Sequence, residues 1–300
     1  MRFLRLVSLL LGAIALQITA GCVHADGGAR SGEAAAPGPA LWKVADEDTT
    51  IYLFGTIHAL PKDVDWYAPH IAQALETSDE LVTEVDLSHA DIMPDLVAEK
   101  AALPEGQNLR DMLDGEQRKA FEHAMISLGL PVQAFDRFEP WYAAMTFSLI
   151  PLLNAGYDTE HGVETVLSQH FGPDKSRDHL ETAEFQIDLF DSLPMDTQIT
   201  YLAEVVRTVP DLKHELDAMV RQWLDGNAQG LARLMKAQET DPLIYRRLIT
   251  DRNAKWAAWV GKRLEKPGTV FIAVGAGHLA GRESLQEQLR KRGIRSARVQ

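Results

Sequence analysis

Two stretches of the chain share one design, Ile51-Tyr-Leu-Phe-Gly-Thr-Ile-His58 and Phe271-Ile-Ala-Val-Gly-Ala-Gly-His278. Each is an apolar run that leads into a Gly-x-x-His tetrapeptide, and such a run is typical of a strand buried on both faces. A glycine at the end of a buried strand lets the backbone turn sharply. We expect the histidine three residues later at the carboxyl edge of the sheet, where open α/β sheets place their functional sites.

The surrounding sequence predicts strands near both ends of the chain and helices between them. Residues 80–85 alternate as a strand does, and residues 90–247 are expected to be predominantly helical. The expected strands are residues 41–44, 50–54, 80–85, 269–274 and 296–299, and the expected outer helices are residues 65–78 and 283–292. The fold class is therefore α/β, with a long helical insert between strands from the two ends of the chain.

The composition is that of a globular protein with an acidic surface. Of 300 residues, 30 are Lys or Arg and 43 are Asp or Glu, which gives a net charge of −13. Such a chain repels phosphate backbones and anionic lipid, so we expect no nucleic-acid partner. The only cysteine is Cys22, so the sequence predicts neither a disulfide framework nor a cysteine-ligated metal site.

Residues 1–22 have the pattern of an export signal, with a short basic start and an apolar run too short to span a bilayer. Ala20-Gly-Cys22 resembles a bacterial lipobox, in which the cysteine carries the lipid. Thr19 departs from that pattern, which usually has an aliphatic residue there. The alternative is ordinary cleavage after Ala25. In both cases we expect the mature protein in the cell envelope facing the periplasm, either as a lipoprotein anchored at Cys22 or as a soluble periplasmic protein.

Residues 23–40 are rich in Gly, Ala and Pro, and we expect a flexible linker there. No second segment of that composition follows, so residues 41–300 are expected to form one folded domain. Apart from a lipid on Cys22, nothing in the sequence predicts contact with a membrane.

Glu84 is the third candidate for chemistry. It shares one side of an otherwise apolar strand with Val82, and a buried carboxylate needs a partner or a metal ion. Two histidines and one carboxylate, here His58, His278 and Glu84, make a facial ligand set that leaves positions open for water and substrate. A metal ion bound there lowers the pKa of its water to about 7 and polarises a carbonyl, which suits acyl hydrolysis.

The same residues have plainer interpretations. A histidine that follows a strand is often a hydrogen-bonded turn residue, and an arginine at the strand end would satisfy Glu84 equally well. The Gly-x-x-His spacing is itself common, since Gly21-Cys-Val-His24 repeats it inside the leader. The domain holds no HExxH, Gly-x-Ser-x-Gly or phosphate-binding glycine loop that would decide between the two interpretations.

An ordered series of short segments accompanies these residues. The segments are the two Gly-x-x-His elements, Leu81-Val-Thr-Glu-Val-Asp86, Pro140-Trp141, Gly156-Tyr-Asp158, Gly162-Val163, Leu180-Glu-Thr182 with Gln186, Arg252-Asn253 and Val274–Leu279 with Gly281. The series resembles the TraB/GumN family, which includes the Tiki-type metalloproteases, from about Leu41 to the C-terminus. It departs from the family pattern at Glu164, where that pattern has Asp.

The resemblance implies a fold of the erythromycin-esterase/ChaN type, in which strands from both ends of the chain form a mixed central sheet surrounded by helices. The family's Tiki members are described as Mn- or Co-dependent peptidases. By this resemblance His58, Glu84 and His278 become ligands of a divalent transition metal, Mn or Co rather than Zn, with Glu84 alternatively the general base. The implied function is an exported metal-dependent hydrolase that cleaves a peptide or a small amide or ester.

The same resemblance gives roles to three further residues. Arg252 is the candidate for stabilising a developing oxyanion, because a guanidinium suits that charge. Its alternative role is a structural ion pair with a carboxylate. Glu181 and Gln186 are candidates for binding substrate in the pocket wall. For them the favoured alternative is a helix N-terminus with Thr182 as its cap.

Two other functions are compatible with the same pocket. The erythromycin-esterase relatives suggest ester hydrolysis without a metal ion, with a histidine as general base. The ChaN-like relatives suggest an envelope lipoprotein that binds haem or iron without catalysis. We expect turnover that resists chelators in the first case, and a haem absorption band without turnover in the second.

Overall fold

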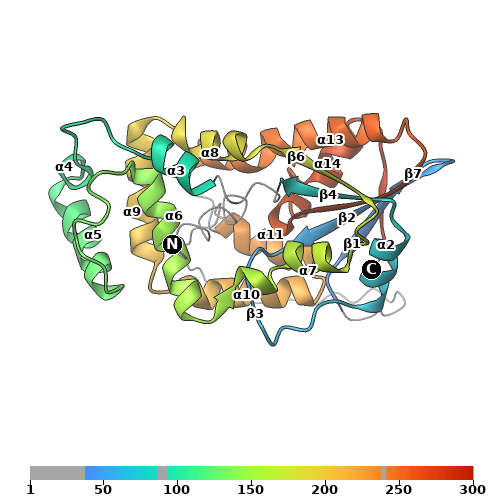
Figure 1. Ribbon diagram of the computed structural model, residues 1–300, viewed down its shortest axis with the longest axis horizontal. Helices are drawn as coiled ribbons and strands as arrows, with labels where there is room; N and C mark the ends of the chain where they lie inside the picture. Colours follow the sequence, from blue (N-terminus) through green and yellow to red (C-terminus); the bar gives the residue numbers. More distant parts are fainter. Residues whose placement is uncertain (1–37, 87–92, 238–240, 300) are drawn as a thin grey trace.

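The computed structural model describes residues 38–86, 93–237 and 241–299 (Figure 1). The predicted signal peptide, the lipidation at Cys22 and most of the predicted linker lie outside these residues and stay predictions. None of the described helices is both long and apolar enough to cross a membrane.

A six-stranded mixed sheet lies at the centre of one half of the molecule (Figure 1). Its strands are β1 (Leu41–Ala45), β2 (Thr49–Thr56), β4 (Glu80–Val85), β6 (Ser176–Glu181), β7 (Gly268–Gly275) and β8 (Ser296–Arg298). They lie in the order β6-β4-β7-β2-β1-β8, and the four from β6 to β2 are parallel. β1 pairs antiparallel with both β2 and β8. A separate two-stranded sheet pairs β3 (Leu60–Pro61) with β5 (Tyr157–Asp158).

Helices make up most of the remaining described chain. The α-helices are α2 (Pro69–Thr77), α3 (Met93–Lys100), α4 (Leu109–Met112), α5 (Gly115–Ser127), α6 (Pro140–Asn154), α7 (Val163–His170), α8 (Ala183–Asp191), α9 (Met195–Thr208), α10 (Leu212–Leu224), α11 (Ala228–Ala237), α12 (Pro242–Tyr245), α13 (Asp251–Arg263) and α14 (Leu285–Lys291). Short 3₁₀ segments are η1 (Thr159–His161) and η3 (Ala276–Leu279), and η2 (Arg246–Thr250) is π-helical.

The predicted mixed central sheet with strands from both ends of the chain is confirmed, with one addition. β6 belongs to the sheet although it lies inside residues 90–247, which were expected to be predominantly helical. Its sequence, Ser-Arg-Asp-His-Leu-Glu, is mostly polar and half exposed because β6 is an edge strand, so it shows neither an apolar run nor a clear alternation. The predicted helix at residues 65–78 begins only at Pro69, whose fixed φ suits the first helical position.

Helices cover both faces of the sheet (Figure 1). On one face α13 and α14 contribute Trp256 and Leu289 to a core that includes Ile272 of β7. On the other face α2, α7 and α10 bury apolar side chains against Phe54 of β2. The Trp223 indole of α10 also donates a hydrogen bond of 2.8 Å to the carbonyl of residue 55. Both faces of the central strands are therefore apolar, as their near-continuous hydrophobic runs predicted.

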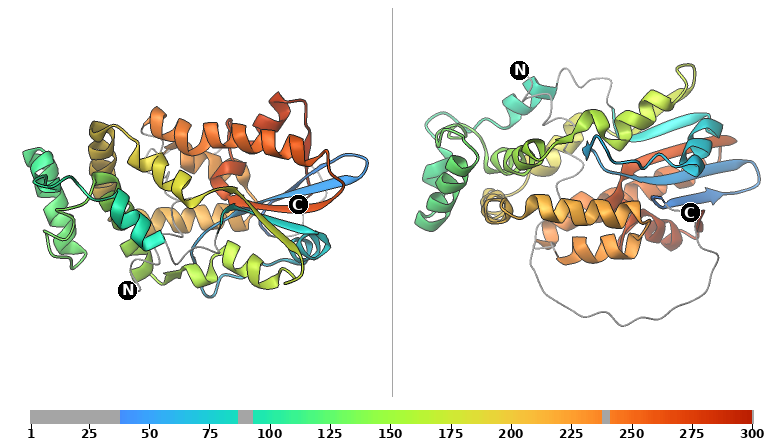
Figure 2. Two further views of the ribbon diagram at one scale, coloured as in Figure 1. Left: turned by 45° about the horizontal axis from the view of Figure 1, so that its top comes forward. Right: turned by 90° about the horizontal axis from the view of Figure 1, so that it is seen from below.

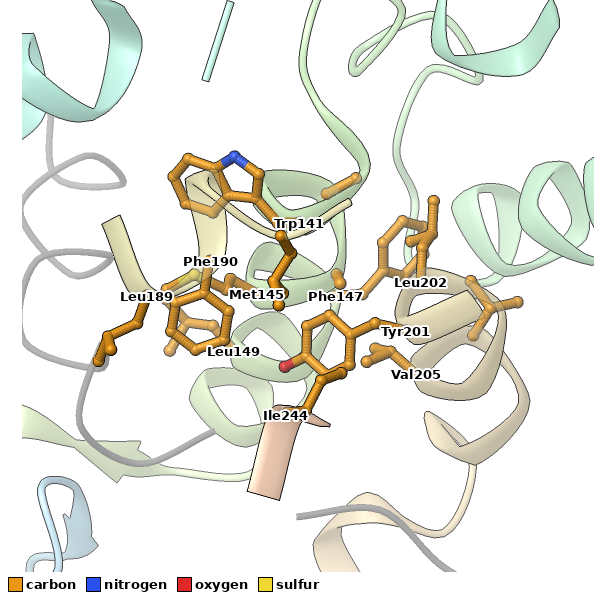
Figure 3. Packing of buried hydrophobic residues seen from close by; sticks show 14 of the residues in the cluster. Trp141, Met145, Phe147, Leu149, Leu189, Phe190, Tyr201, Leu202, Val205 and Ile244 are labelled. Atoms are coloured by element: carbon orange, nitrogen blue, oxygen red, sulfur yellow. The ribbon is translucent and has the colours of Figure 1, made fainter. Parts of the chain in front are cut away.

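The helical insert forms the other half of the molecule, with α4 and α5 farthest from the sheet (Figures 1 and 2). Its core joins α6, α8 and α9 around Trp141, Phe190 and Tyr201 (Figure 3). Val85 at the end of β4 and Ala276 just after β7 pack against the same core. The insert therefore closes over the carboxyl ends of the parallel strands, the edge that the two histidines follow.

One carboxyl group of α10 makes the stability of this fold depend on pH. Burial and the negative charge of Asp211 raise the pKa of Glu215 from 4.5 to about 7, against the opposing charge of Arg207. The folded state therefore holds this proton more tightly than the unfolded chain does. The stability that this bound proton adds to the folded state is therefore lost as the pH rises from about 4.5 to about 7.

We expect Glu215→Gln to raise the free energy of unfolding by about 1 kcal/mol at about pH 8 and to leave it unchanged at about pH 4, since solvent screens a part-buried carboxylate. Urea unfolding at both pH values measures this difference. The exposed Glu47 provides the control, because Glu47→Gln should alter neither value. An equal gain for Glu215→Gln at both pH values would contradict the assignment.

Candidate functional site

The structure brings the two Gly-x-x-His elements together at one edge of the sheet. β2 and β7 are parallel neighbours, with Gly55 opposite Val274, and β4 lies on the other side of β7. Burial and the charge of Arg252 dominate the pKa of both Glu84 and His278, and a protonated His58 contributes a smaller lowering to each, so the three side chains share one electrostatic environment. Residues from opposite ends of the chain thus follow neighbouring parallel strands at the same edge of the sheet.

The glycines of the two motifs serve a different purpose from the expected sharp turn. Neither Gly55 nor Gly275 has a positive φ. A Cβ on Gly55 would lie 3.0 Å from the Cα of Ala276, which is tighter than most real Cβ contacts, and one on Gly277 would lie 2.6 Å from Met235 Cε, at the end of a flexible side chain. The glycines therefore allow the first motif to approach the backbone of the second and let α11 pack against it.

Glu84 is an ionised carboxylate held from two sides. It is 2% exposed, and its Oε2 accepts the backbone N–H of Gly275 at 3.0 Å. Its Oε1 accepts Gln186 Nε2 at 3.0 Å and also Arg252 Nη2. Burial alone would raise the pKa of Glu84, but the charge of Arg252, with smaller contributions from His278 and His58, lowers it to about 2.

His278 is a neutral imidazole fixed at both nitrogens. Its Nε2 lies 3.2 Å from Arg252 Nη1, and a guanidinium can only donate, so Nε2 is the acceptor. The other nitrogen, Nδ1, then carries the proton and donates to Asn253 Oδ1 at 2.8 Å. Burial and the charge of Arg252 lower the pKa of His278 to about 3, against the attraction of Glu84.

Arg252 is the cation at the centre of this cluster, 1% exposed and stacked over Trp256. Its Nε donates to Glu181 Oε1 at 2.9 Å, and its Nη2 to Glu181 Oε2 at 2.7 Å and to Glu84. Its Nη1 donates to the carbonyl of Leu248 at 3.1 Å and to His278. All five N–H groups thus have acceptors. This arrangement favours the structural ion pair, and a direct hydrogen bond to a substrate oxyanion would require one of these contacts to break.

Glu181 and Gln186 lie in the same cluster, at the end of β6 and in α8. Burial raises the pKa of Glu181, against the charge of Arg252. Gln186 Nε2 bridges Glu84 and Glu181, and Thr182 caps α8 by accepting the N–H of Phe185 at 3.2 Å. The favoured cap interpretation is thus correct for Thr182, while Glu181 and Gln186 point into the cluster. Substrate binding by these two residues stays a prediction.

Glu164 is a residue of the site for which the sequence analysis predicts no role. It is 8% exposed in the first turn of α7, and its Oε1 accepts the hydroxyl of Thr56 at 2.5 Å. The same oxygen pairs with His58 Nδ1. The one available signal was its place after Gly162-Val163 in the ordered series of segments, where Glu stands in place of Asp.

The three predicted ligands have donor atoms of the types that a divalent metal ion binds, but their arrangement in the structure does not suit a metal ion. An ionised carboxylate and neutral imidazoles are suitable donors, and an acceptor on Nδ1 orients each ring as in metal sites. The guanidinium of Arg252, however, already donates to Glu84 and to His278 Nε2. Across residues 38–86, 93–237 and 241–299, no three His, Cys, Asp or Glu side chains are arranged to hold a metal ion. Metal binding here would require Arg252 to withdraw.

We expect Arg252→Met to lower the free energy of unfolding by about 3–5 kcal/mol, because it leaves the buried carboxylates of Glu84 and Glu181 without their counterion. Arg252→Lys, which keeps the charge but has fewer donors, should lose less. Urea unfolding at neutral pH measures both. The triple variant Arg252→Met/Glu84→Gln/Glu181→Gln should recover part of the loss, and a loss below about 1 kcal/mol for Arg252→Met would contradict this account.

A family model and related proteins from two organisms match most of this chain. A model of the TraB/PrgY/gumN family matches residues 40–298. An uncharacterized protein of Treponema pallidum (strain Nichols) is 22% identical over 271 residues, which is 85% of this chain and 81% of that protein. The uncharacterized protein YbaP of Escherichia coli (strain K12) is 27% identical over 240 residues, which is 80% of this chain and 87% of YbaP. No solved structure matches. With the family model matched from the first strand to the last, this chain belongs to the TraB/PrgY/gumN family.

Proposed function

We propose that this chain is an exported hydrolase that cleaves an amide, in a peptide or a small molecule, or an ester. The observation on which the proposal rests is that two imidazoles and an ionised carboxylate lie at the same edge of the sheet. Of these three groups, His58 has the most exposed side chain, with 11% of its area exposed, although its Nε2 atom is buried. Carboxyl edges of parallel strands are the usual place for such sites. The proposal of export depends on the leader at residues 1–22.

In the proposed reaction His58 takes a proton from water while the water oxygen attacks the carbonyl carbon. The tetrahedral intermediate then collapses as the carbon–nitrogen bond breaks, and His58 returns the proton to the leaving nitrogen. The products are a carboxylic acid and an amine, or an alcohol from an ester. Arg252 stabilises the developing oxyanion through its fixed positive charge. Glu84 stays ionised throughout, because its pKa is about 2.

Metal-dependent hydrolysis, the activity implied by the sequence resemblance, is the second candidate. It is supported by the donor types of His58, Glu84 and His278 and by the acceptors that orient both rings. These residues would hold Mn or Co once Arg252 had withdrawn from His278. When bound, the ion would act as a Lewis acid toward the carbonyl and lower the pKa of water.

A screen of the purified chain against peptide, amide and ester substrates tests the proposal. We expect His58→Ala and His278→Ala each to lower kcat/KM by about 100-fold or more, because the first removes the base and the second disturbs the cluster beside it. His123→Ala, at an exposed position of α5, is the matched control and should leave kcat/KM unchanged. Full activity of His58→Ala would overturn the proposal.

Chelation separates the two forms of hydrolysis. Turnover that survives EDTA supports activation of water by His58 alone. Turnover that EDTA abolishes and Mn²⁺ or Co²⁺ restores supports the metal-dependent form, and elemental analysis should then show less metal in Glu84→Ala. A haem titration covers the remaining alternative, since a Soret band without turnover of any substrate would favour a binding protein.

A further inference from the structure

We infer that Glu164 is a positioning residue for His58, which keeps the proton of the neutral ring on Nδ1 and so makes Nε2 the basic nitrogen. The inference rests on the proposed role of His58 as the base. The contact that carries it is the pairing of Glu164 Oε1 with His58 Nδ1, in a place where the carboxylate is 8% exposed. A carboxylate can only accept, and the hydrogen bond at one ring nitrogen decides which nitrogen keeps the proton.

The backbone around Glu164 is built for this contact. A Cβ on Gly162 would lie 2.0 Å from the carbonyl oxygen of His58, so only glycine allows the two segments to lie this close. The next residue, Val163, donates its backbone N–H to the carbonyl of Ile57 at 3.0 Å. The start of α7 is thereby docked on the residues that carry the imidazole, and Glu164 follows directly.

A third group fixes the carboxylate itself. Thr56 donates its hydroxyl to the same Oε1 that pairs with His58, and its side chain is buried in the last position of β2. The base, its carboxylate and the residue that orients the carboxylate thus come from two segments that lie 108 residues apart in the sequence. Such a chain of orienting contacts locks the rotamers of a working site.

The two histidines differ in the residue that holds Nδ1, and this difference assigns the base. His278 donates to the neutral amide of Asn253 and lies against the positive charge of Arg252. His58 is held by the carboxylate of Glu164, whose negative charge stabilises the imidazolium that forms when the ring takes a proton. At His58 the compensating carboxylate is therefore in direct contact with the ring, whereas at His278 burial and the charge of Arg252 outweigh the attraction of Glu84.

Nitrogen-15 NMR of the histidine rings tests the inference directly, on the full chain without substrate and at about pH 8, where a neutral imidazole shows its tautomer. We expect wild-type His58 to carry its proton on Nδ1. In Glu164→Met the ring should change to the Nε2–H form that prevails in water, while Glu164→Asp should keep the wild-type signature. An Nε2–H ring in the wild type, or an unchanged ring in Glu164→Met, would overturn the inference.

Kinetics on a substrate from the screen provide the second readout. We expect Glu164→Met to lower kcat by about 100-fold or more with little change in KM, and Glu164→Asp to recover most of that loss. Glu160→Gln removes a charge from an exposed position four residues earlier and should change neither constant. The tautomer measurement needs no turnover, so an Nδ1–H ring in a chain without hydrolytic activity would uphold the role of Glu164 while the proposed function failed. A kcat loss that Glu164→Asp does not recover, with native-like unfolding of both variants, would count against positioning.

Discussion

The structure of the site depends on one buried cation. The guanidinium of Arg252 in α13 contacts Glu84 at the end of β4, Glu181 at the end of β6 and His278 after β7. A buried charge costs several kcal/mol unless partners surround it, and here every N–H of the guanidinium has an acceptor. Three neighbouring strand ends and one helix are therefore fixed relative to each other by a single side chain. The carbonyl that Arg252 also contacts, at Leu248, belongs to a π-helical turn, an irregularity often found at functional sites.

Close backbone approach is the second constraint. Gly55 lies against Ala276 and Gly162 against the carbonyl of His58, so two glycines let three loops meet where larger residues would separate them. The site is thereby divided into two parts with different tasks. His278, Glu84 and Arg252 form a buried part whose charges are mutually satisfied, and His58 with Glu164 forms a less deeply buried part, in which the two side chains are 11% and 10% exposed. Hydrolytic chemistry of either candidate form would take place at the boundary between them.

Much of this could be predicted from the sequence where the signal was local. The apolar runs before Gly55 and Gly275 correspond to β2 and β7, while the ordered series of short segments indicated the family, and that resemblance implied the mixed sheet. β6 was not predicted, because an exposed edge strand needs no apolar alternation. The purpose of the motif glycines was misjudged for a related reason: a turn is a property of one segment, whereas close approach involves two.

Local sequence patterns were enough to predict the class of fold, the family and the three residues, His58, Glu84 and His278, around which we build the candidate site. Hydrophobic periodicity and glycine spacing record such features within a few neighbouring positions. The contacts of Arg252 with both Glu84 and His278, and of Glu164 with His58, became visible only in the folded chain. The residues of these contacts are 168, 26 and 106 positions apart. Contacts across such separations leave no periodic trace in the chain, and any of its 43 acidic residues could have been the partner of Arg252 or His58.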